Sequence, residues 1–373
     1  MPSKSIDKTD IELIILLQEK PLANYSVMAK LLDLSSPTIK RRLDRLYEGI
    51  IEKVIAIPRY SALGLTTVSC FIKLKADSLI TDLEKVIDDH PYLYFRERAY
   101  GHMNGLHCTF RIPMTGVPLI KELFEKLKES LIEEYSLILH PNVKNSIRST
   151  PRFSAYDSKM NTWEFDWIKW IETSKEKIAR GDSHIIKESP ENILKNLEYL
   201  DLEILSILSD NSRQKNVEIL EKLSTEISPQ RLSDKLREIR SKTISAHRVY
   251  LNWSVFDFSE VIFDCVATKE NTKFLKSLIS SIPPPFRTTF RRYSLEDGDD
   301  TMEGFYWYLT CPPSHLTSAF EAVLKIAEDV KFYLLNAKKR YRKPLNLKAL
   351  DKDTMDWKLD RKFLLEDVLA NIP

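Results

Sequence analysis

Apolar residues recur at two different spacings in the first part of the chain. In the segments 9–19, 26–32 and 36–48 they return every three or four residues, as in helices with one buried face. The next run, "IIEKVIAI", ends before Pro58 and is rich in β-branched residues, as is "TTVSCFIKLK" over Thr66–Lys75. Such runs favour strands. The pattern therefore predicts three short helices followed by strands.

Residues 63–145 continue with strands and helices in a regular order. After the first strand, an amphipathic helix is predicted over 79–89, and the runs "YLYFRERAY" and "LHCTFRIPM" then favour two strands around a glycine-containing turn. A helix in "VPLIKELFEKLKESLI" and a strand in "YSLILH" complete the segment. The order β-α-β-β-α-β is that of a ferredoxin-like domain.

The same pattern returns in the second half of the chain. "TDIELIILL" is echoed by "LDLEILSIL", "SSPTIKRRLDRL" by "ISPQRLSDKLREI", and "WEFDWIKW" by "WKLDRKFL". The three matches keep their order at a separation of about 190 residues, which indicates an internal duplication. We therefore predict an α+β protein with two winged helix-turn-helix domains and two ferredoxin-like βαββαβ domains in tandem.

The repeats divide the chain into six segments. We expect a first winged helix-turn-helix in 1–62, a first ferredoxin-like domain in 63–145, a Trp-rich helical extension and linker in 146–195, a second winged helix-turn-helix in 196–255, a second ferredoxin-like domain in 256–340 and a C-terminal extension in 341–373. In the first extension Trp163, Trp167 and Trp170 recur at helical spacing. We expect this stripe to dock onto the body of the protein.

The composition narrows the function classes. Lys and Arg together number 56 against 54 Asp and Glu, so any signal for nucleic-acid binding must lie in local placement of charge. Eight glycines are few for Gly-rich phosphate loops, and four scattered cysteines disfavour a zinc cluster. No apolar run is long enough to span a membrane, and the N-terminus is polar. We expect a cytoplasmic protein with no membrane contact, no metal and no cofactor.

The helix predicted over 36–48 combines an apolar stripe with a basic face. Ile39, Leu43 and Leu46 share one side, and Arg41 lies almost opposite them. A short helix and a tight turn precede it, which is the layout of a helix-turn-helix whose last helix enters the major groove of DNA. In the first module we predict DNA contacts from Ser35, Ser36, Thr38, Lys40, Arg41, Arg42 and Arg45, and from Lys53 and Arg59 in the following wing.

The second module carries a similar basic segment with one difference. Aligning Ile39 with Leu232 places Asp234 where the first module has Arg41. A carboxylate repels phosphate, whereas an arginine can bind guanine with two hydrogen bonds. We therefore expect the first module to be the main base reader, and the second to bind more weakly, to read a different half-site or to hold phosphates only. Its predicted DNA contacts are Gln230, Arg231, Lys235, Arg237 and Arg248.

These residues also carry a resemblance to a known family. The stretch "DIELIILL" followed by "YSVMAKLLDLSSPTIKRRLDRLYEGIIE" resembles the N-terminal winged helix of the Lrp/AsnC family of transcription regulators. The βαββαβ segment after it resembles their C-terminal RAM domain, and the resemblance extends to about Asn142. It implies transcriptional control through DNA binding, pairing of RAM domains, and sensing of a small effector such as an amino acid. Gly101 matches a family glycine that shapes the effector site, and Asn104 stands near the position of its acidic residue.

Ordinary family members carry one such unit and form dimers. A chain with two units is expected to pair its RAM domains internally, and association into a homo-oligomer through RAM-type domains would be a further step. Two different DNA-reading modules in one molecule would suit an asymmetric site.

Two other functions fit parts of the sequence. A nucleoid protein that coats DNA without sequence preference would also need a basic helix. Siroheme decarboxylases resemble this chain as enzymes on the same Lrp/AsnC-like fold, and "HMNGLH" places His102 and His107 close to Arg96 and Arg98. Their aromatic-Arg-acid-His order is only partly present, because Arg98 stands where that histidine would fall. We expect a regulator without catalytic residues.

Overall fold

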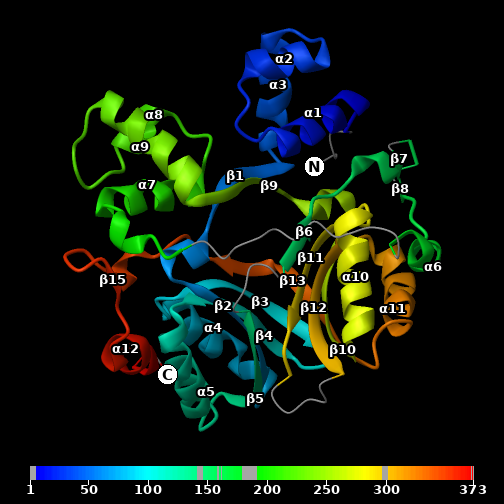
Figure 1. The fold of residues 1–373 in the computed structure, drawn as a ribbon, viewed down its shortest axis with the longest axis vertical. Helices are drawn as coiled ribbons and strands as arrows, with labels where there is room; N and C mark the ends of the chain where they lie inside the picture. Colours follow the sequence, from blue (N-terminus) through cyan, green and yellow to red (C-terminus); the bar gives the residue numbers. More distant parts are fainter. Residues whose placement is uncertain are drawn as a thin grey trace.

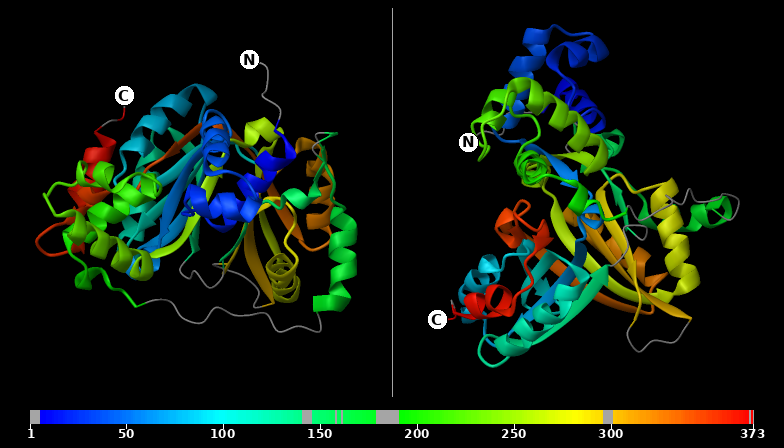
Figure 2. Two further views of the ribbon diagram at one scale, coloured as in Figure 1. Left: turned by 90° about the horizontal axis from the view of Figure 1, so that it is seen from above. Right: turned by 60° about the vertical axis from the view of Figure 1, so that its left-hand side comes forward.

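The computed structural model describes residues 6–140, 146–157, 159–160, 162–178, 191–295, 301–370 and 372. Two small helical modules lie at one end of the molecule, and a broad sheet with its covering helices lies at the other (Figures 1 and 2). The segment 179–190, which we assigned to the linker, lies outside the described residues.

The first helical module consists of α1 (Lys8–Glu19), α2 (Tyr25–Leu32) and α3 (Ser36–Tyr47), close to the bounds that the apolar spacing predicts. Each helix begins at a side chain that accepts a backbone N–H: Asp7 before α1, Asn24 before α2 and Ser35 before α3. The turn after α2 passes through Asp33 in the left-handed conformation. These caps fix the short helices, which would be marginal in isolation.

The second helical module repeats this order of elements. It comprises α7 (Tyr199–Asp210), α8 (Asn216–Leu220) and α9 (Pro229–Lys242). Ser228 caps α9 by accepting the N–H of Arg231, as Ser35 caps α3.

The strands that follow α3 and α9 pair with each other. β1 (Ile51–Pro58) and β9 (Ile244–Leu251) form an antiparallel ribbon in which Val54 faces Val249. α1 packs against β9, and α7 packs against β1. The wing that we expected within each module is therefore replaced by one ribbon shared between them.

The main sheet has nine strands in the order β5-β2-β4-β3-β13-β10-β12-β11-β6. Its first half contains β2 (Thr66–Leu74), α4 (Ile80–Asp89), β3 (Leu93–Gly101), β4 (Gly105–Ile112), α5 (Val117–Leu127) and β5 (Ile132–His140). Its second half contains β10 (Ser259–Thr268), α10 (Lys269–Ser281), β11 (Arg287–Tyr293), β12 (Met302–Cys311), α11 (Leu316–Leu324) and β13 (Asp329–Arg342), and β6 (Ser146–Ser149) extends it. Each half has the strand order of a βαββαβ unit.

The two halves of the sheet join along β3 and β13. Gly101 pairs with Tyr333 and Arg98 with Asn336 across this seam. At the other side β11 approaches β5, so the sheet curls toward closure (Figure 1). Pairing of the two RAM-like halves within one chain was our expectation, and the described residues form such a seam.

The extensions after each half pack on the opposite half. α6 (Trp167–Ile178) lies against α10 and α11, with the Trp167 side chain 1% exposed and the indole N–H of Trp170 donating to Ile282 O at 2.7 Å. The C-terminal extension covers α4 and α5 through the π-helical turn Lys362–Glu366 and α12 (Asp367–Leu369). Docking of the Trp stripe onto the body is confirmed, and the exchange between halves is an additional finding.

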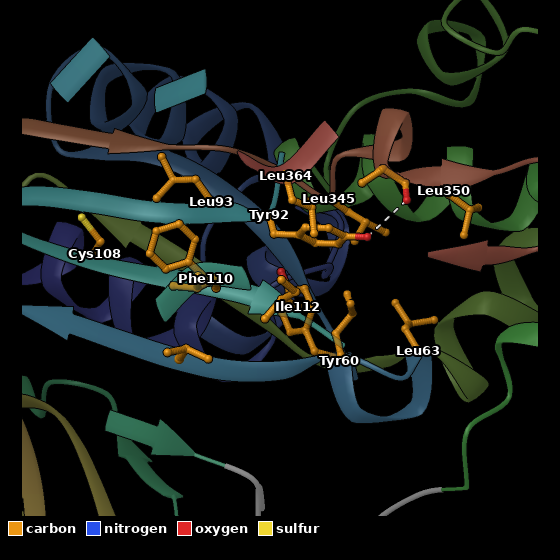
Figure 3. Close-up of a cluster of buried hydrophobic side chains, with 14 of the residues drawn as sticks. Tyr60, Leu63, Tyr92, Leu93, Cys108, Phe110, Ile112, Leu345, Leu350 and Leu364 are labelled. Carbon is orange, nitrogen blue, oxygen red and sulfur yellow. Dashed lines mark hydrogen bonds between the residues drawn. The ribbon is translucent and has the colours of Figure 1, made fainter. Parts of the chain in front are cut away.

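Figure 3 shows how the C-terminal extension completes the first core. Leu345, Leu350 and Leu364 lie among Tyr92, Phe110 and other buried side chains of the first half. The Tyr92 hydroxyl donates to Ala349 O at 3.3 Å and to Lys358 O at 2.8 Å.

The remaining elements are short. The two-stranded pairs are β7 (Tyr156–Asp157) with β8 (Thr162–Trp163), and β14 (Leu350–Asp351) with β15 (Asp356–Trp357). Single 3-10 turns occur at Tyr60–Leu63, Asp77–Leu79, Met114–Gly116, Phe153–Ala155, Leu194–Asn196, Trp253–Phe256, Pro313–His315 and Leu347–Ala349. None of the described helices is long and apolar enough to cross a membrane.

Candidate nucleic-acid interface

The α3 helix presents Arg41 to solvent. Ile39, Leu43 and Leu46 are 0%, 0% and 1% exposed and anchor the opposite side of the helix in the core. Arg41 is exposed and forms no salt bridge with a described residue. Its guanidinium group is therefore free to bind an external partner.

The N-terminal turn of α3 is well ordered by its own side chains. The Ser35 Oγ accepts the N–H of Thr38 at 3.2 Å and lies 2.8 Å from the Thr38 hydroxyl. Ser36 is half-buried at the first helical position. Lys40 is exposed and pairs with Asp44 one turn later, at 3.2 Å. Such an exposed pair is weak, so Lys40 can exchange Asp44 for a phosphate.

Arg42 and Arg45 have internal partners that the sequence did not predict. The Arg42 guanidinium donates to Asp7 and to Asp10, each at 2.8 Å, and Arg45 also pairs with Asp10. Asp10 is 1% exposed. Burial alone would raise the pKa of Asp7, but its hydrogen bonds to Arg42 and the Asp10 N–H lower it. These two arginines fix α3 against the start of α1.

The two predicted wing residues lie at the junction of the modules. The Lys53 ammonium is 2.7 Å from the Asp210 carboxylate at the end of α7. The Arg59 Nε donates to Ile244 O at the start of β9, at 3.1 Å. Both side chains thus connect the first module to the second.

Two basic residues of α9 pair with carboxylates at the start of α7. Lys235 pairs with Asp201 at 2.9 Å and with Glu198 at 3.1 Å, which is the arrangement of Arg42 with Asp10 and Asp7. Arg231 also pairs with Glu198, at 3.4 Å.

Asp234 binds the side chains of two further residues of α9 that we predicted as DNA contacts. It accepts from the Gln230 amide at 3.3 Å and pairs with Arg237 at 3.4 Å. Arg248 is not on this surface: it is half-buried on β9, where burial and then the charge of Arg148 lower its pKa to about 10. Arg231, Lys235 and Arg237 of α9 thus all have carboxylate partners, whereas Arg41 of α3 has none among the described residues.

The predicted effector residues share the turn between β3 and β4. Gly101 has a φ of +118°, and a Cβ there would lie 2.7 Å from Phe332 O on β13. The Gly101 N–H donates to the Asn104 Oδ1 at 3.4 Å. This turn therefore packs directly on the seam between the two halves of the sheet.

Three of the four residues that suggested the enzyme alternative have carboxylate partners: Arg96, Arg98 and His107. Arg96 pairs with Glu84 and Asp88, each at 2.7 Å, and Arg98 pairs with Glu84 at 2.8 Å. His107 is 2% exposed, and its Nδ1 lies 3.4 Å from the Glu97 carboxylate. Neither arginine is free to hold a substrate carboxylate in this arrangement.

Sequence reasoning missed a group of six arginines where the ribbon meets the sheet, and it named only one of them, Arg248, as a DNA contact. The six lie on four strands of the sheet and on β9 of the ribbon, so no local motif marks the group, and only the fold brings them together.

Known proteins resemble the chain at two levels. Residues 6–47 match the model of the AsnC-type helix-turn-helix domain. An uncharacterized HTH-type transcriptional regulator of Pyrococcus furiosus is 30% identical over 102 residues, which cover 27% of this chain and 69% of that protein. Among solved structures, Escherichia coli AsnC is 19% identical, with a TM-score of 0.31 over 39% of this chain and 97% of its own. The siroheme decarboxylase NirDL is 12% identical, with a TM-score of 0.48 over 97% and 98% of the two chains.

The helical module and its relatives define a DNA-binding protein of the helix-turn-helix class. More particularly, the chain belongs to the Lrp/AsnC family of transcription regulators, as the resemblance of its first module implied.

Proposed function

We propose that the protein is a sequence-specific transcription regulator in which α3 enters the major groove and Arg41 contacts a base edge. The observation that carries this proposal is the exposed Arg41, which has no ion pair among the described residues, on a helix whose other arginines, Arg42 and Arg45, hold it in place. An arginine on a firmly held helix can present its guanidinium to the two acceptors of guanine. Lys40, Thr38 and the Ser35–Ser36 turn would contact the flanking phosphates.

A single chain would present two DNA-binding modules, as a dimer of ordinary family members does. We infer an internal duplication from the repeated order of helices, from the repeated strand order, and from the shared ion pairs of Arg42 and Lys235. The six-segment division of the chain is part of this proposal. The β1–β9 ribbon would hold the two modules at a set spacing, so half-sites would lie about one helical turn apart or a multiple of it.

The two modules are proposed to act unequally. Asp234 stands on α9 where α3 carries Arg41. It accepts a hydrogen bond from Gln230 and forms an ion pair with Arg237. The second module would therefore contribute phosphate contacts and little base discrimination. An amino-acid effector, if bound at the turn of Gly101 and Asn104, would act on the β3–β13 seam, and two chains could associate through their sheets.

Selection from random DNA tests this function. The wild-type chain is expected to enrich a motif, and Arg41→Ala is expected to lose preference at one base, worth roughly 1–3 kcal/mol. Arg237→Ala is the matched control, because it removes an exposed arginine from the other module and should leave the motif unchanged. No enrichment by the wild type would instead support a nucleoid-type role without sequence preference.

A further inference from the structure

Six arginines gather where the shared ribbon meets the curled sheet. They are Arg111 on β4, Arg148 on β6, Arg248 on β9, Arg287 and Arg291 on β11, and Arg342 on β13, and we call them the arginine cluster. Arg148 is exposed, and the other five are half-buried. The cluster thus opens to water at β6 and is otherwise enclosed by strands of both halves.

Strand register brings three of these arginines onto one face. Residues two apart on a strand share a face, so Arg287, Thr289 and Arg291 point the same way. Arg148 pairs directly with Thr289 across the β6–β11 ladder and therefore lies on that face between the other two arginines.

Tyrosine rings alternate with the guanidinium groups of the remaining arginines. Arg111 lies over Tyr60 at 4.3 Å and over Tyr94 at 4.9 Å. Arg342 lies over Tyr94 at 5.3 Å and over Tyr250 at 5.1 Å. The stacked rings hold the guanidinium planes in place. Arg111 donates from Nη1 to the Thr67 hydroxyl, and its Nε has no acceptor among the described residues.

Arg287 extends this row, at 5.8 Å from the Tyr250 ring. Arg287 also lies on the face of β11 that Arg148 shares, and the charges of Arg148 and Arg287 both act on Arg248. The six arginines therefore form one continuous group.

Carboxylates balance little of the charge of the described cluster: Glu260 interacts electrostatically with Arg287 but forms its ion pair with Arg340. Among the described residues, none of the six forms a salt bridge, whereas the neighbouring Arg340 pairs with Glu97 and Glu260. The Arg111 Nε and the Arg342 Nε and Nη2 are buried without a hydrogen-bond partner in the described part of the chain. Half-buried cations without ion pairs and buried donors without acceptors are costly, and a bound anion would supply both the missing charge and the missing acceptors.

The mutual repulsion is visible in the proton affinities. Burial, followed by the charges of Arg148 and Arg111, lowers the pKa of Arg291 to about 9. Burial would raise the pKa of Tyr250, but the surrounding Arg342, Arg248 and Arg287 lower it to about 7. The positive charge of the cluster therefore acts even on the ionisation of the tyrosine within it.

We infer that the arginine cluster binds a small organic anion with two or more carboxylate or phosphate groups. Guanidinium edges bind such groups with paired hydrogen bonds, and cations from five strands can contact several groups of one ligand. Two pockets reach the cluster: one is lined by Tyr60, Tyr94 and Arg111, the other by Arg248, Tyr250 and Arg287. The enclosing strands favour a small molecule over a duplex.

The ligand would connect the DNA-reading end to the sheet. Arg248 belongs to the ribbon that carries both modules, whereas Arg291 and Arg148 belong to the sheet. An anion that contacts both would fix the ribbon on the sheet. This effect on DNA binding depends on the proposed function, but anion binding itself does not.

Anion binding can be measured on the full chain without DNA. Citrate represents the carboxylate arm and inorganic pyrophosphate the phosphate arm, titrated calorimetrically and by Tm at constant ionic strength set with chloride. We expect saturable binding of at least one probe, with a Tm increase of several degrees. Arg148→Gln and Arg291→Gln should each weaken binding at least tenfold, and Arg361→Gln, which removes the same charge from the distant C-terminal extension, should not.

The Tm of each variant without ligand shows whether its arginine binds the anion or only stabilises the fold. Because the arginines repel one another, Arg148→Gln and Arg291→Gln should leave the ligand-free Tm equal or higher. Absence of saturable binding to the wild type for both probes would overturn the inference, as would unchanged affinity in variants with a lowered Tm. If the anion binds but selection from random DNA enriches no motif, the inference about the arginine cluster is supported and the proposed function is wrong.

Discussion

Arg42 and Asp10 are joined by a contact of 2.8 Å, in which the carboxylate is 1% exposed and the guanidinium belongs to the helix proposed to read DNA. The contact fixes the angle between α1 and α3. Lys235 and Asp201 make the equivalent contact in the second module at 2.9 Å. Both modules therefore use a basic residue of the third helix for internal order, which leaves Arg41 as the exposed arginine of α3.

Loss of this contact should destabilise the first module. Arg42→Ala leaves the buried Asp10 with only Arg45 as a cationic partner, and removal of one member of a buried pair costs roughly 3 kcal/mol. Urea unfolding followed by circular dichroism measures the change. Lys40→Ala is the control, because its exposed pair with Asp44 should be worth less than about 1 kcal/mol. Equal effects of the two variants would show that Asp10 does not depend on Arg42.

The salt dependence of DNA binding should distinguish two lysines. Lys40→Ala is expected to reduce the slope of log K against log salt by about 0.9, the value for one phosphate contact. Lys53→Ala should reduce it less, because its ammonium is held by Asp210. Fluorescence anisotropy at several salt concentrations gives both slopes. A larger loss for Lys53 would mean that the ribbon, and not α3, lies along the phosphates.

Gly101 should resist substitution. Its φ of +118° is strained for other residues, and a Cβ would meet Phe332 O across the seam, so Gly101→Ala should lower stability by about 1–3 kcal/mol. Gly49→Ala is a suitable control, since nothing lies within 4 Å of a Cβ there. Chemical unfolding of both variants checks this. A Gly101→Ala protein as stable as Gly49→Ala would show that the seam tolerates a side chain.

Tyr250 should ionise near neutral pH. The lowered pKa of about 7 predicts tyrosinate absorbance that appears with a midpoint near pH 7 and is absent in Tyr250→Phe. The unfolded pKa is about 10, so the folded state loses this proton first. The stabilisation from Tyr250 is therefore complete above pH 10 and is lost as the pH falls through 7. An ultraviolet titration without multivalent anions measures the midpoint, and a value near 10 would contradict the electropositive cluster.

The sequence predicted what is encoded locally. The apolar stripe of Ile39, Leu43 and Leu46 and the β-α-β-β-α-β order of elements in the first half both follow from spacing and residue type. The partners of charged residues could not be predicted in the same way. Asp10 is more than thirty residues from Arg42, and Asp210 lies on another module from Lys53.

The arrangement of the two halves was also beyond local patterns. Pairing of β1 with β9 and the exchange of extensions join segments far apart in the chain. The arginine cluster depends on both, because Arg248 reaches Arg148 only when the ribbon folds over the sheet. These arginines lie on five different strands, two of them on β11, and only the tertiary fold shows that they share a site.

The most direct test of the regulator proposal compares affinities for the selected DNA motif and for a scrambled duplex at one salt concentration. The wild type should bind the motif at least a hundredfold more tightly, and Arg41→Ala should lose most of this ratio while it keeps its affinity for scrambled DNA within a few fold. Arg237→Ala should keep the ratio. An unchanged ratio in Arg41→Ala, together with a lost ratio in Arg237→Ala, would contradict the assignment of α3 as the reading helix.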